Sequence, residues 1–159
     1  MKVKICFNLM LVFAIIFFVS CEKDNEPTGN NDLVLFEFHR FGGWFGLNET
    51  LRIDADFTHY SISYANRGES FHTTVKTSAE QWNSLTRDFD LETFRKIENG
   101  SCRACRDGFD EKFSLIQSNT IYFIYNADDD KHFKQMQNFF DAIFKQAEDL
   151  KSMANFENQ

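Results

Sequence analysis

Alternating apolar and charged residues in the middle of the chain constrain its fold more than any other feature. Between Thr50 and Phe57, the polar residues Arg52, Asp54 and Asp56 alternate with apolar ones. A period of two places the two kinds of side chain on opposite faces of a β-strand. We therefore predict a strand with one buried face and one wet face, as in an antiparallel sheet. The residues expected to face inward are Leu51, Ile53, Ala55 and Phe57.

Several other segments have the composition or the alternation of strands. Turn residues separate them at Gly42-Gly43, at Asn66-Arg67-Gly68 and at Ser118-Asn119. The last two turns predict hairpins, because such residues adopt the tight turns that join antiparallel strands. The sequence thus predicts about six strands. The segments are 33–41, 50–57, 60–64, 71–75, 113–117 and 120–126.

Helices are predicted by their N-terminal capping residues and by apolar residues at helical spacing. Ser78 and Gln81 fit a capping box, in which each side chain bonds the backbone of the other residue. Asp90 can cap a second, short helix. The acidic run Asp128–Asp130 precedes a last helix, predicted as one element over Lys131–Lys151. Its predicted apolar stripe is Phe133, Met136, Phe140, Ile143, Phe144 and Ala147.

The order of these elements is strands, helix, hairpin, helix. This order predicts an α+β fold, with helices packed on one face of an antiparallel β-sheet of about six strands. Residues 33–151 are long enough to bury one core and form a single domain, and residues 152–159 are expected to fray as a tail.

The N-terminus has the organisation of a secretory signal peptide. Lys2 and Lys4 precede an apolar run over 5–19, and the small residue Ser20 stands before Cys21. The run is shorter than the roughly 20 residues that a membrane-spanning helix needs. Residues 1–20 are therefore predicted to be a signal peptide that is removed.

The end of this segment, Phe18-Val19-Ser20-Cys21, resembles a bacterial lipobox, although Phe18 stands where Leu is usual. The resemblance implies that Cys21 is lipidated, for example with palmitate, and becomes the first residue of a mature lipoprotein. Two or three acyl chains would anchor such a protein to a membrane. The lipobox thus implies a cell-envelope location.

Residues 21–32 are predicted to be a lipidated cysteine followed by a flexible tether. The segment has no large apolar residue after Cys21 and holds the only proline, Pro27. Its acidic start resembles the surface-export signals of Bacteroidota-type lipoproteins, but an ordinary solvated tether is the favoured interpretation, and a protein that faces the inner leaflet is a further alternative. The resemblance implies an outer-membrane protein on the periplasmic or the surface side.

The folded part is similar in outline to small uncharacterised α+β domains of Bacteroidota lipoproteins. The residues that carry this similarity are Tyr60–Tyr64, Gln81–Leu85 and Asp107–Leu115. Those domains have no agreed activity, so the similarity implies a fold and a location and no chemistry. The mature chain would have 15 basic and 24 acidic side chains, a formal charge of −9. This acidity argues against nucleic acid as a partner.

Cys102 and Cys105 form the one constellation with possible chemistry. In an extracytoplasmic compartment a structural disulfide is favoured. The alternative is thiol–disulfide exchange, in which Arg103 and Arg106 would stabilise a thiolate. Free or intermolecular thiols are a third alternative. A short helix precedes the pair, whereas redox motifs of the thioredoxin type follow a strand, so the context favours a disulfide that fastens a loop.

No metal site or cofactor is predicted. Two cysteines supply half of a structural zinc site, and the acidic run Asp128–Asp130 lacks the spacing of a calcium-binding loop. The histidines are scattered along the chain, without the spacing of paired ligands. They are His39, His59, His72 and His132.

The sequence contains no recognisable catalytic set, which makes an enzyme the less favoured class. We predict a non-catalytic binding or assembly module that meets an envelope protein or peptide, and a thiol–disulfide redox protein is the alternative. The expected partner contacts of the binding module are Trp44, Phe45 and Phe109, which lie in two predicted loops. For the loop with Trp44 and Phe45, folding over the end of the sheet is the favoured prediction and a recognition surface is the alternative.

Overall fold

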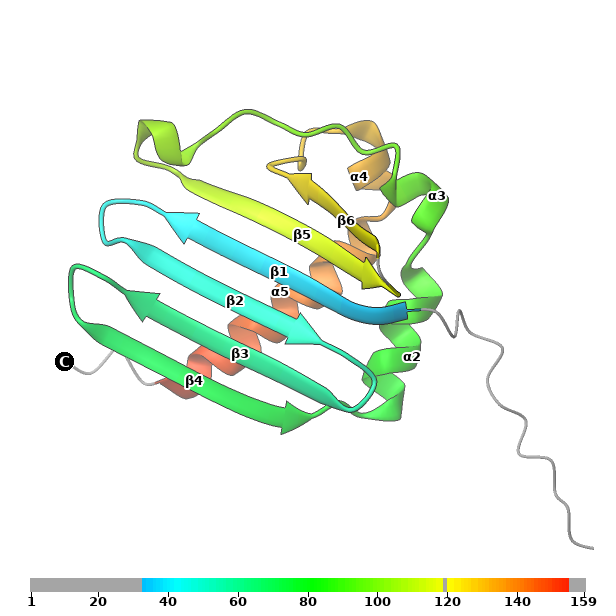
Figure 1. The fold of residues 1–159 in the computed structure, drawn as a ribbon, viewed down its shortest axis with the longest axis horizontal. Coiled ribbons are helices and arrows are strands. Elements are labelled where there is room, and N and C mark those ends of the chain that lie inside the picture. Colours follow the sequence, from blue (N-terminus) through cyan, green and yellow to red (C-terminus); the bar gives the residue numbers. More distant parts are fainter. Residues whose placement is uncertain (1–32, 119, 155–159) are drawn as a thin grey trace, which may run out of the picture.

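A computed structural model describes residues 33–118 and 120–154 of the chain. The predicted signal peptide, lipidated Cys21, the tether and most of the tail lie outside these residues. The described chain forms one six-stranded antiparallel sheet with the order β4-β3-β2-β1-β5-β6 (Figure 1). The strands are β1 (Leu33–Gly42), β2 (Leu47–Ile53), β3 (Phe57–Tyr64), β4 (Glu69–Lys76), β5 (Phe109–Gln117) and β6 (Thr120–Tyr125).

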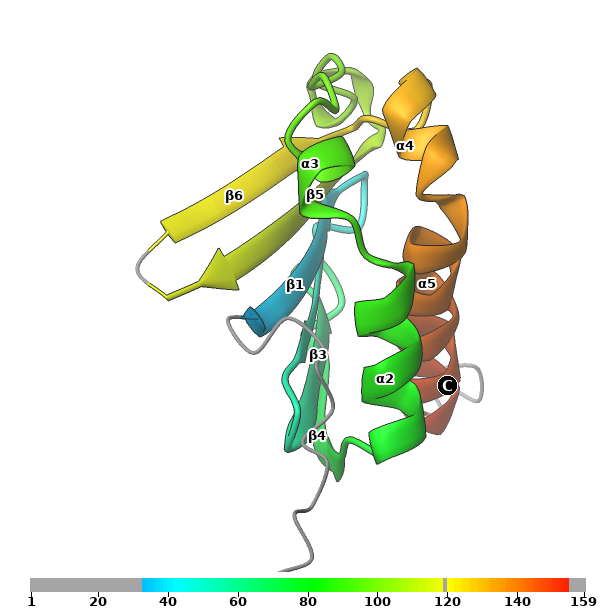
Figure 2. The same ribbon diagram turned by 90° about the vertical axis from the view of Figure 1, so that its right-hand side faces the viewer.

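The helices of the described chain cover one face of this sheet and leave the other face open (Figure 2). This arrangement and the order of the elements confirm the predicted α+β class. The α-helices are α2 (Ala79–Asp88), α3 (Leu91–Phe94), α4 (Lys131–Gln135) and α5 (Gln137–Lys151). The short 3-10 helices are η2 (Ala104–Arg106) and η3 (Ser152–Ala154).

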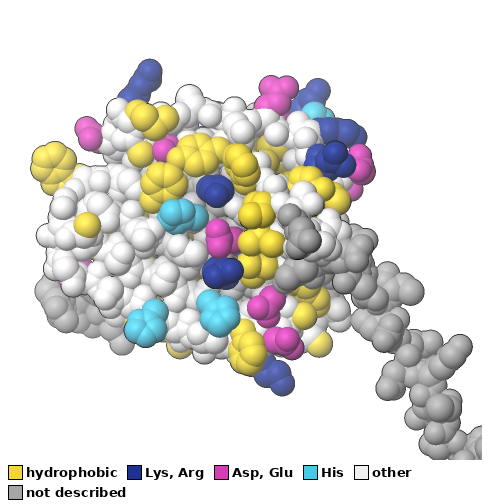
Figure 3. Space-filling view, viewed as in Figure 1, with side chains coloured by type: hydrophobic (Ala, Val, Ile, Leu, Met, Phe, Trp, Pro, Cys, Tyr) yellow, Lys and Arg dark blue, Asp and Glu magenta, His cyan; other side chains and the backbone are white. Residues whose placement is uncertain are grey.

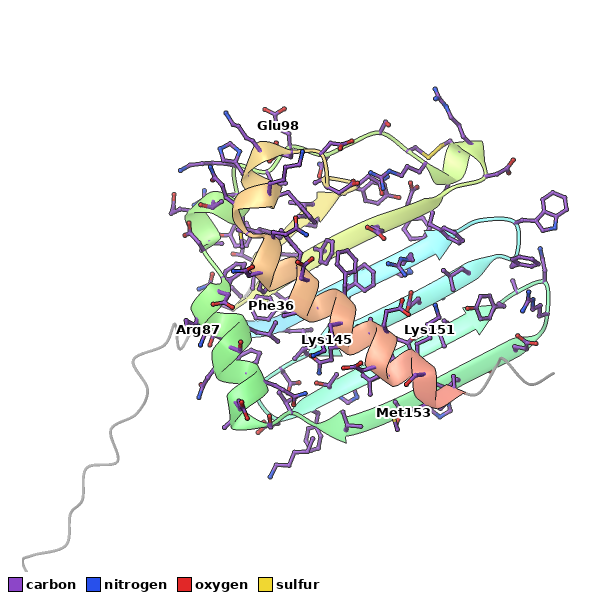
Figure 4. All side chains as sticks on the ribbon, turned by 180° about the vertical axis from the view of Figure 1, so that it is seen from behind. Phe36, Arg87, Glu98, Lys145, Lys151 and Met153 are labelled. Atoms are coloured by element: carbon purple, nitrogen blue, oxygen red, sulfur yellow. A yellow bond between two sulfur atoms is a disulfide. The ribbon has the colours of Figure 1, made fainter. Side chains whose placement is uncertain are left out.

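Phenylalanine rings fill the space between the helices and the sheet. Phe36 of β1 contacts Phe139 of α5 at a ring-centroid distance of 5.0 Å and Trp82 of α2 at 5.8 Å. Phe133 and Phe140 stack in parallel at 3.8 Å. Figure 4 shows this layer from behind, with Phe36 next to the helices and α5 crossing the strands. Large buried rings of this kind supply most of the apolar area in the core.

The strand predicted over Thr50–Phe57 ends earlier than expected: β2 stops at Ile53, a turn follows, and Phe57 is the first residue of β3. The Asp54 carboxylate accepts the backbone N–H groups of Asp56 at 2.8 Å and of Phe57 at 2.7 Å. An aspartate that bonds its own following backbone replaces the sheet ladder by a turn. The period of two therefore ends at Ile53, and the prediction that Ala55 and Phe57 face inward is wrong: both are exposed.

The predicted caps are confirmed, but the predicted last helix is interrupted. Ser78 and Gln81 make both hydrogen bonds of the capping box, and the Asp90 carboxylate caps α3. Asp130 caps α4 by accepting the N–H groups of His132 and Phe133. The helix predicted over Lys131–Lys151 breaks at Met136, whose φ of −102° and ψ of 19° are not helical. The break lets the two pieces differ in direction while their apolar stripes both face the core.

The open face of the sheet is mixed in character. Figure 3 shows histidine side chains and single charged side chains over its middle, with apolar side chains gathered on the side of β5 and β6. His39 bonds Asn48 at 2.6 Å and His59 bonds Thr74 at 3.0 Å, each from the neighbouring strand. These two histidines are therefore satisfied by cross-strand partners.

Candidate functional site

Two predicted contact loops that are far apart in sequence lie side by side at one end of the sheet. The Gly43 N–H, in the β1–β2 turn, donates to the Gly108 carbonyl at 2.9 Å. Gly43 has a φ of +68°, and a Cβ atom there would lie 2.4 Å from the Phe109 ring. The backbone conformation favours glycine here, and a larger side chain would also have to displace the Phe109 ring. The structure in this way brings the turn that carries Trp44 and Phe45 next to the loop that carries Phe109.

A third loop, the β3–β4 turn, joins this group. The Ala65 and Asn66 N–H groups donate to the carbonyls of Gly46 and Phe45 at 3.1 and 3.2 Å. The Arg67 guanidinium lies 4.4 Å from the centroid of the Phe45 ring, at cation–π distance. We call residues 43–46, 65–68 and 102–109 together the loop end. Its three loops are joined by backbone hydrogen bonds and form one continuous surface.

The loop end exposes large aromatic side chains. Trp44 is 78% exposed, Phe45 45% and Phe109 43%. The prediction that this aromatic loop folds over the end of the sheet is wrong for Trp44, whose side chain points into solvent. A group of large aromatic rings exposed to water is typical of surfaces that bind other proteins.

The loop end lies at the far side of the sheet from the point where the described chain begins. Strand β1 starts at Leu33 and runs 10 residues to Gly42, directly before the β1–β2 turn (Figure 1). At about 3.3 Å per residue, β1 separates the two ends of the sheet by about 30 Å.

The buried carboxylate of Asp110 fastens the loop that carries the two cysteines. Asp110 is 2% exposed, and its carboxylate accepts the N–H groups of Arg103 at 2.6 Å and Ala104 at 3.1 Å. It also accepts the Asn126 amide at 2.7 Å and the Tyr125 hydroxyl at 3.0 Å. Asp110 therefore connects the loop at 102–108 to the end of β6.

These donors stabilise the charged form of the carboxylate. Burial alone would raise the pKa of Asp110, but the backbone N–H of Arg103 and the other donors outweigh it and hold the pKa below its ordinary value. Burial and the bond to Asp110 raise the pKa of Tyr125, which stays a protonated donor. No motif in the sequence pointed to Asp110, because its burial and its donors become apparent only in the folded chain.

Cys102 and Cys105 flank the start of η2, with their sulfur atoms 2.03 Å apart, at disulfide distance. Both residues are exposed. The Cys105 N–H lies 3.1 Å from Cys102 Sγ, and the Asp110 carboxylate lies 3.5 Å from the same sulfur. Of the two arginines thought to stabilise a thiolate, Arg103 is paired with Asp128. The positive charge available to a Cys102 thiolate is thereby reduced.

A second buried carboxylate, Glu49, lies on the helix-covered face. Glu49 is fully buried, accepts the Tyr60 hydroxyl at 2.7 Å and pairs with Arg40 at 3.3 Å. Burial and the bond to Glu49 raise the pKa of Tyr60 far above its usual range. Arg40 also reaches Glu111 of β5 at 3.0 Å and Glu148 of α5 at 3.6 Å. The sequence carried a signal for this network, because Glu49 stands two residues before Leu51 and so shares its inward face.

Among residues 33–118 and 120–154, no three histidine, cysteine or acidic side chains are grouped so that they could hold a metal ion. Within the same ranges, no helix has both the length and the apolar character needed to cross a membrane. A scan of protein-family models finds no match to this chain, and a search of curated proteins finds none either.

Proposed function

We propose that this chain is a lipid-anchored protein of the cell envelope that acts as a non-catalytic binding module. Its partner is another envelope protein or a peptide, and the loop end is the surface that binds it. The observation that carries the proposal is the exposure of Trp44 on a loop held by backbone hydrogen bonds. A tryptophan that is exposed and held in place is the kind of residue that dominates binding energy at protein interfaces.

The order of the loop end supports this proposal. Association costs less conformational entropy when the contact residues are already fixed in the free protein. Hydrogen bonds from the β3–β4 turn fix the carbonyls of Phe45 and Gly46, and Asn66 also bonds the carbonyl of Trp44. Arginine is enriched at interfaces as aromatic residues are, and Arg67 lies over the Phe45 ring.

The position of the loop end suits a tethered protein. The anchor proposed at Cys21 precedes Leu33, which lies at the opposite end of the sheet (Figure 1). A partner approaching the loop end therefore meets the side of the domain that is remote from the first residue of β1.

A thiol–disulfide redox protein is the second candidate. The observation that favours it is the exposure of Cys102 and Cys105, with the Cys105 N–H placed to donate to Cys102 Sγ. A hydrogen bond of this kind stabilises a thiolate at Cys102. Thiol trapping with mass spectrometry on intact cells separates the candidates, since a cycling pair shows a reduced fraction and a structural disulfide stays oxidised and resists mild reductant.

The binding proposal is tested by photo-crosslinking in cells that make the full chain. A photoreactive amino acid at Trp44 is expected to give a covalent adduct with one defined partner, identified by mass spectrometry. The matched control is Phe57, which is 49% exposed at the opposite end of the sheet and should give no such adduct. The substitutions Trp44→Ala and Phe45→Ala together should remove the interaction without unfolding the protein. Capture that persists in this variant contradicts the proposed surface.

A further inference from the structure

Strand β6 is an edge of the sheet that is only partly covered. The Asn126 N–H donates to the Glu111 carbonyl of β5 at 2.9 Å, so the even-numbered residues of β6 face β5 and the odd-numbered ones face outward. The outward groups of Tyr125 are taken by the Asn99 side chain at 2.8 Å and the Gly100 N–H at 2.7 Å. The backbone groups of Ile121 and Phe123 face outward, and no described segment pairs with them.

The side chains of β6 leave this edge apolar. The strand reads Thr-Ile-Tyr-Phe-Ile-Tyr without a charged residue, and Ile121 is 61% and Phe123 55% exposed on the open face. On the other face, a shallow groove separates β6 from Phe94, Arg95 and Ile97. Proteins usually protect free edges with charge, because an unprotected edge pairs with another strand.

The opposite edge of the sheet shows such protection. Strand β4 carries Glu69 and Lys76 at its two ends and His72 in its middle, and it exposes no large apolar side chain. The two edges of one sheet thus differ in both charge and apolar exposure. The difference indicates that β6 is covered by a strand when the protein is assembled.

We propose that the strand covering β6 is β6 of a second copy of this chain, paired antiparallel about a two-fold axis at Tyr122. In this register Ile121 lies opposite Phe123 of the second copy, and each such pair exchanges two hydrogen bonds. Tyr122 lies opposite Tyr122 of the second copy. Residues opposite one another point to the same face, so the exposed side chains of Ile121 and Phe123 meet on the open face.

The unpaired backbone groups of β6 are arranged so that a two-fold axis can pair them with those of a second copy. The free part of the edge consists of the outward residues Ile121 and Phe123, and Tyr122 is midway between them. A two-fold axis at Tyr122 therefore pairs all the free groups of both strands and none of the groups already bonded at Tyr125. The same patch serves on both copies, as an isologous interface requires.

The surroundings of β6 permit this approach. Figure 2 shows the β5–β6 hairpin projecting away from the helix layer, so a second hairpin can lie beside it. Two cations lie close to the strand: Arg95 stacks over Tyr122 at 5.6 Å and pairs with Glu92 at 3.6 Å, and Lys112 lies over the Phe123 ring at 5.3 Å. No uncompensated charge of the strand itself is brought against its copy.

Two double variants test this register in the purified full chain, kept in excess detergent. Ile121→Glu with Phe123→Glu places like charges opposite each other twice, whereas Ile121→Lys with Phe123→Glu places opposite charges there. We expect the protein mass from sedimentation, corrected for detergent, to be dimeric for the native chain and the Lys/Glu variant and monomeric for the Glu/Glu variant. A monomeric native chain, or the same mass for both variants, overturns the proposal.

Crosslinking in cells supplies an independent measurement. Cysteine at position 122 of two copies would lie at a distance that a disulfide can bridge, because opposed residues outside the hydrogen-bonded pairs have Cα atoms about 4.5 Å apart. Tyr122→Cys should give a covalent dimer on oxidation, and the matched control Thr74→Cys on β4 should not. Equal dimer from both variants, no dimer from Tyr122→Cys, or its adduct with a different protein overturns pairing with a second copy.

Discussion

Glu49 and Asp110 are both buried carboxylates of the sheet, but they hold different parts of the molecule. Glu49 lies on the helix-covered face, where Arg40 links it to β5 and to α5. Asp110 lies opposite Phe41 in the sheet register and so faces the other side, where it binds the N–H groups of the loop at 102–108. Glu49 joins the sheet to the helix layer, whereas Asp110 fastens a loop to the sheet.

The difference separates the framework of this protein from its loop end. Loss of Glu49 leaves the buried Tyr60 hydroxyl without its acceptor. It also takes from Arg40 its one fully buried partner, while Glu111 and Glu148 remain. Loss of Asp110 releases two donors in the loop at 102–108 and two at the end of β6, all at one end of the sheet. We therefore expect substitutions at Glu49 to affect global unfolding and substitutions at Asp110 to affect one end of the molecule.

The largest effect is predicted for Glu49→Ala. The substitution leaves the buried Tyr60 hydroxyl unpaired and removes the fully buried partner of Arg40, although Glu111 and Glu148 still compensate the guanidinium. We therefore expect a loss of about 3 kcal/mol of unfolding free energy, the low end for breaking a buried ion pair. Chemical denaturation of native and variant chains measures this loss. The control Glu80→Ala, on an exposed position of α2, should change stability by less than about 0.5 kcal/mol. A similar small loss at Glu49 would mean that the pair does not join the layers.

A smaller effect is predicted for Asp110→Asn. The amide keeps the shape of the side chain but loses the charge that several donors stabilise, and hydrogen bonds to a charged group contribute about 1.5–3 kcal/mol. We expect a loss of about 2–3 kcal/mol, with faster amide hydrogen exchange at Arg103 and Ala104 and little change in β2 and β3. Exchange that rises evenly over the whole sheet would contradict the separation of loop and framework.

The effect of Asp110→Asn should depend on pH. The folded-state pKa of Asp110 is depressed, so its contribution to stability is complete above the unfolded-state pKa of about 3.9 and is lost as the pH falls through the folded value. The stability difference between native chain and variant should be constant from about pH 6 to pH 8 and should shrink below about pH 4. Denaturation curves across this range measure it, and a difference that grows in acid would show that the carboxylate is not stabilised as an anion.

Local signals in the sequence were sufficient to predict much of the fold. Ser78 with Gln81 and Asp90 determine helix starts through bonds to residues two or three positions away. The alternation over β2 and β3 predicted the packed face because that face is buried over its whole length. The turn at Asp54 and the helix break at Met136 were not predicted. In each case the sequence pattern, an alternation at Asp54 and an apolar stripe at Met136, continues on both sides of the interruption.

The loop end could be predicted only in part. Trp44, Phe45 and Phe109 were identified by their residue types, but their proximity depends on the pairing of Gly42 in β1 with Phe109 in β5. That register joins segments far apart in sequence, and no local pattern encodes it. The role of Asp110 was missed for the same reason, since its donors come from the loop before it and from the end of β6.

The smallest effect on stability is predicted for Cys102→Ser with Cys105→Ser. A disulfide that closes so short a ring contributes about 2 kcal/mol at most in the chain-entropy model. Asp110 continues to bind Arg103 and Ala104 in this variant, so the loop keeps its main attachment. Because disulfide and carboxylate hold the same loop, their losses should not add, and denaturation of the variant combined with Asp110→Asn measures the coupling. Strict additivity would mean that they hold different structures, and Asp110 would then belong to the framework with Glu49.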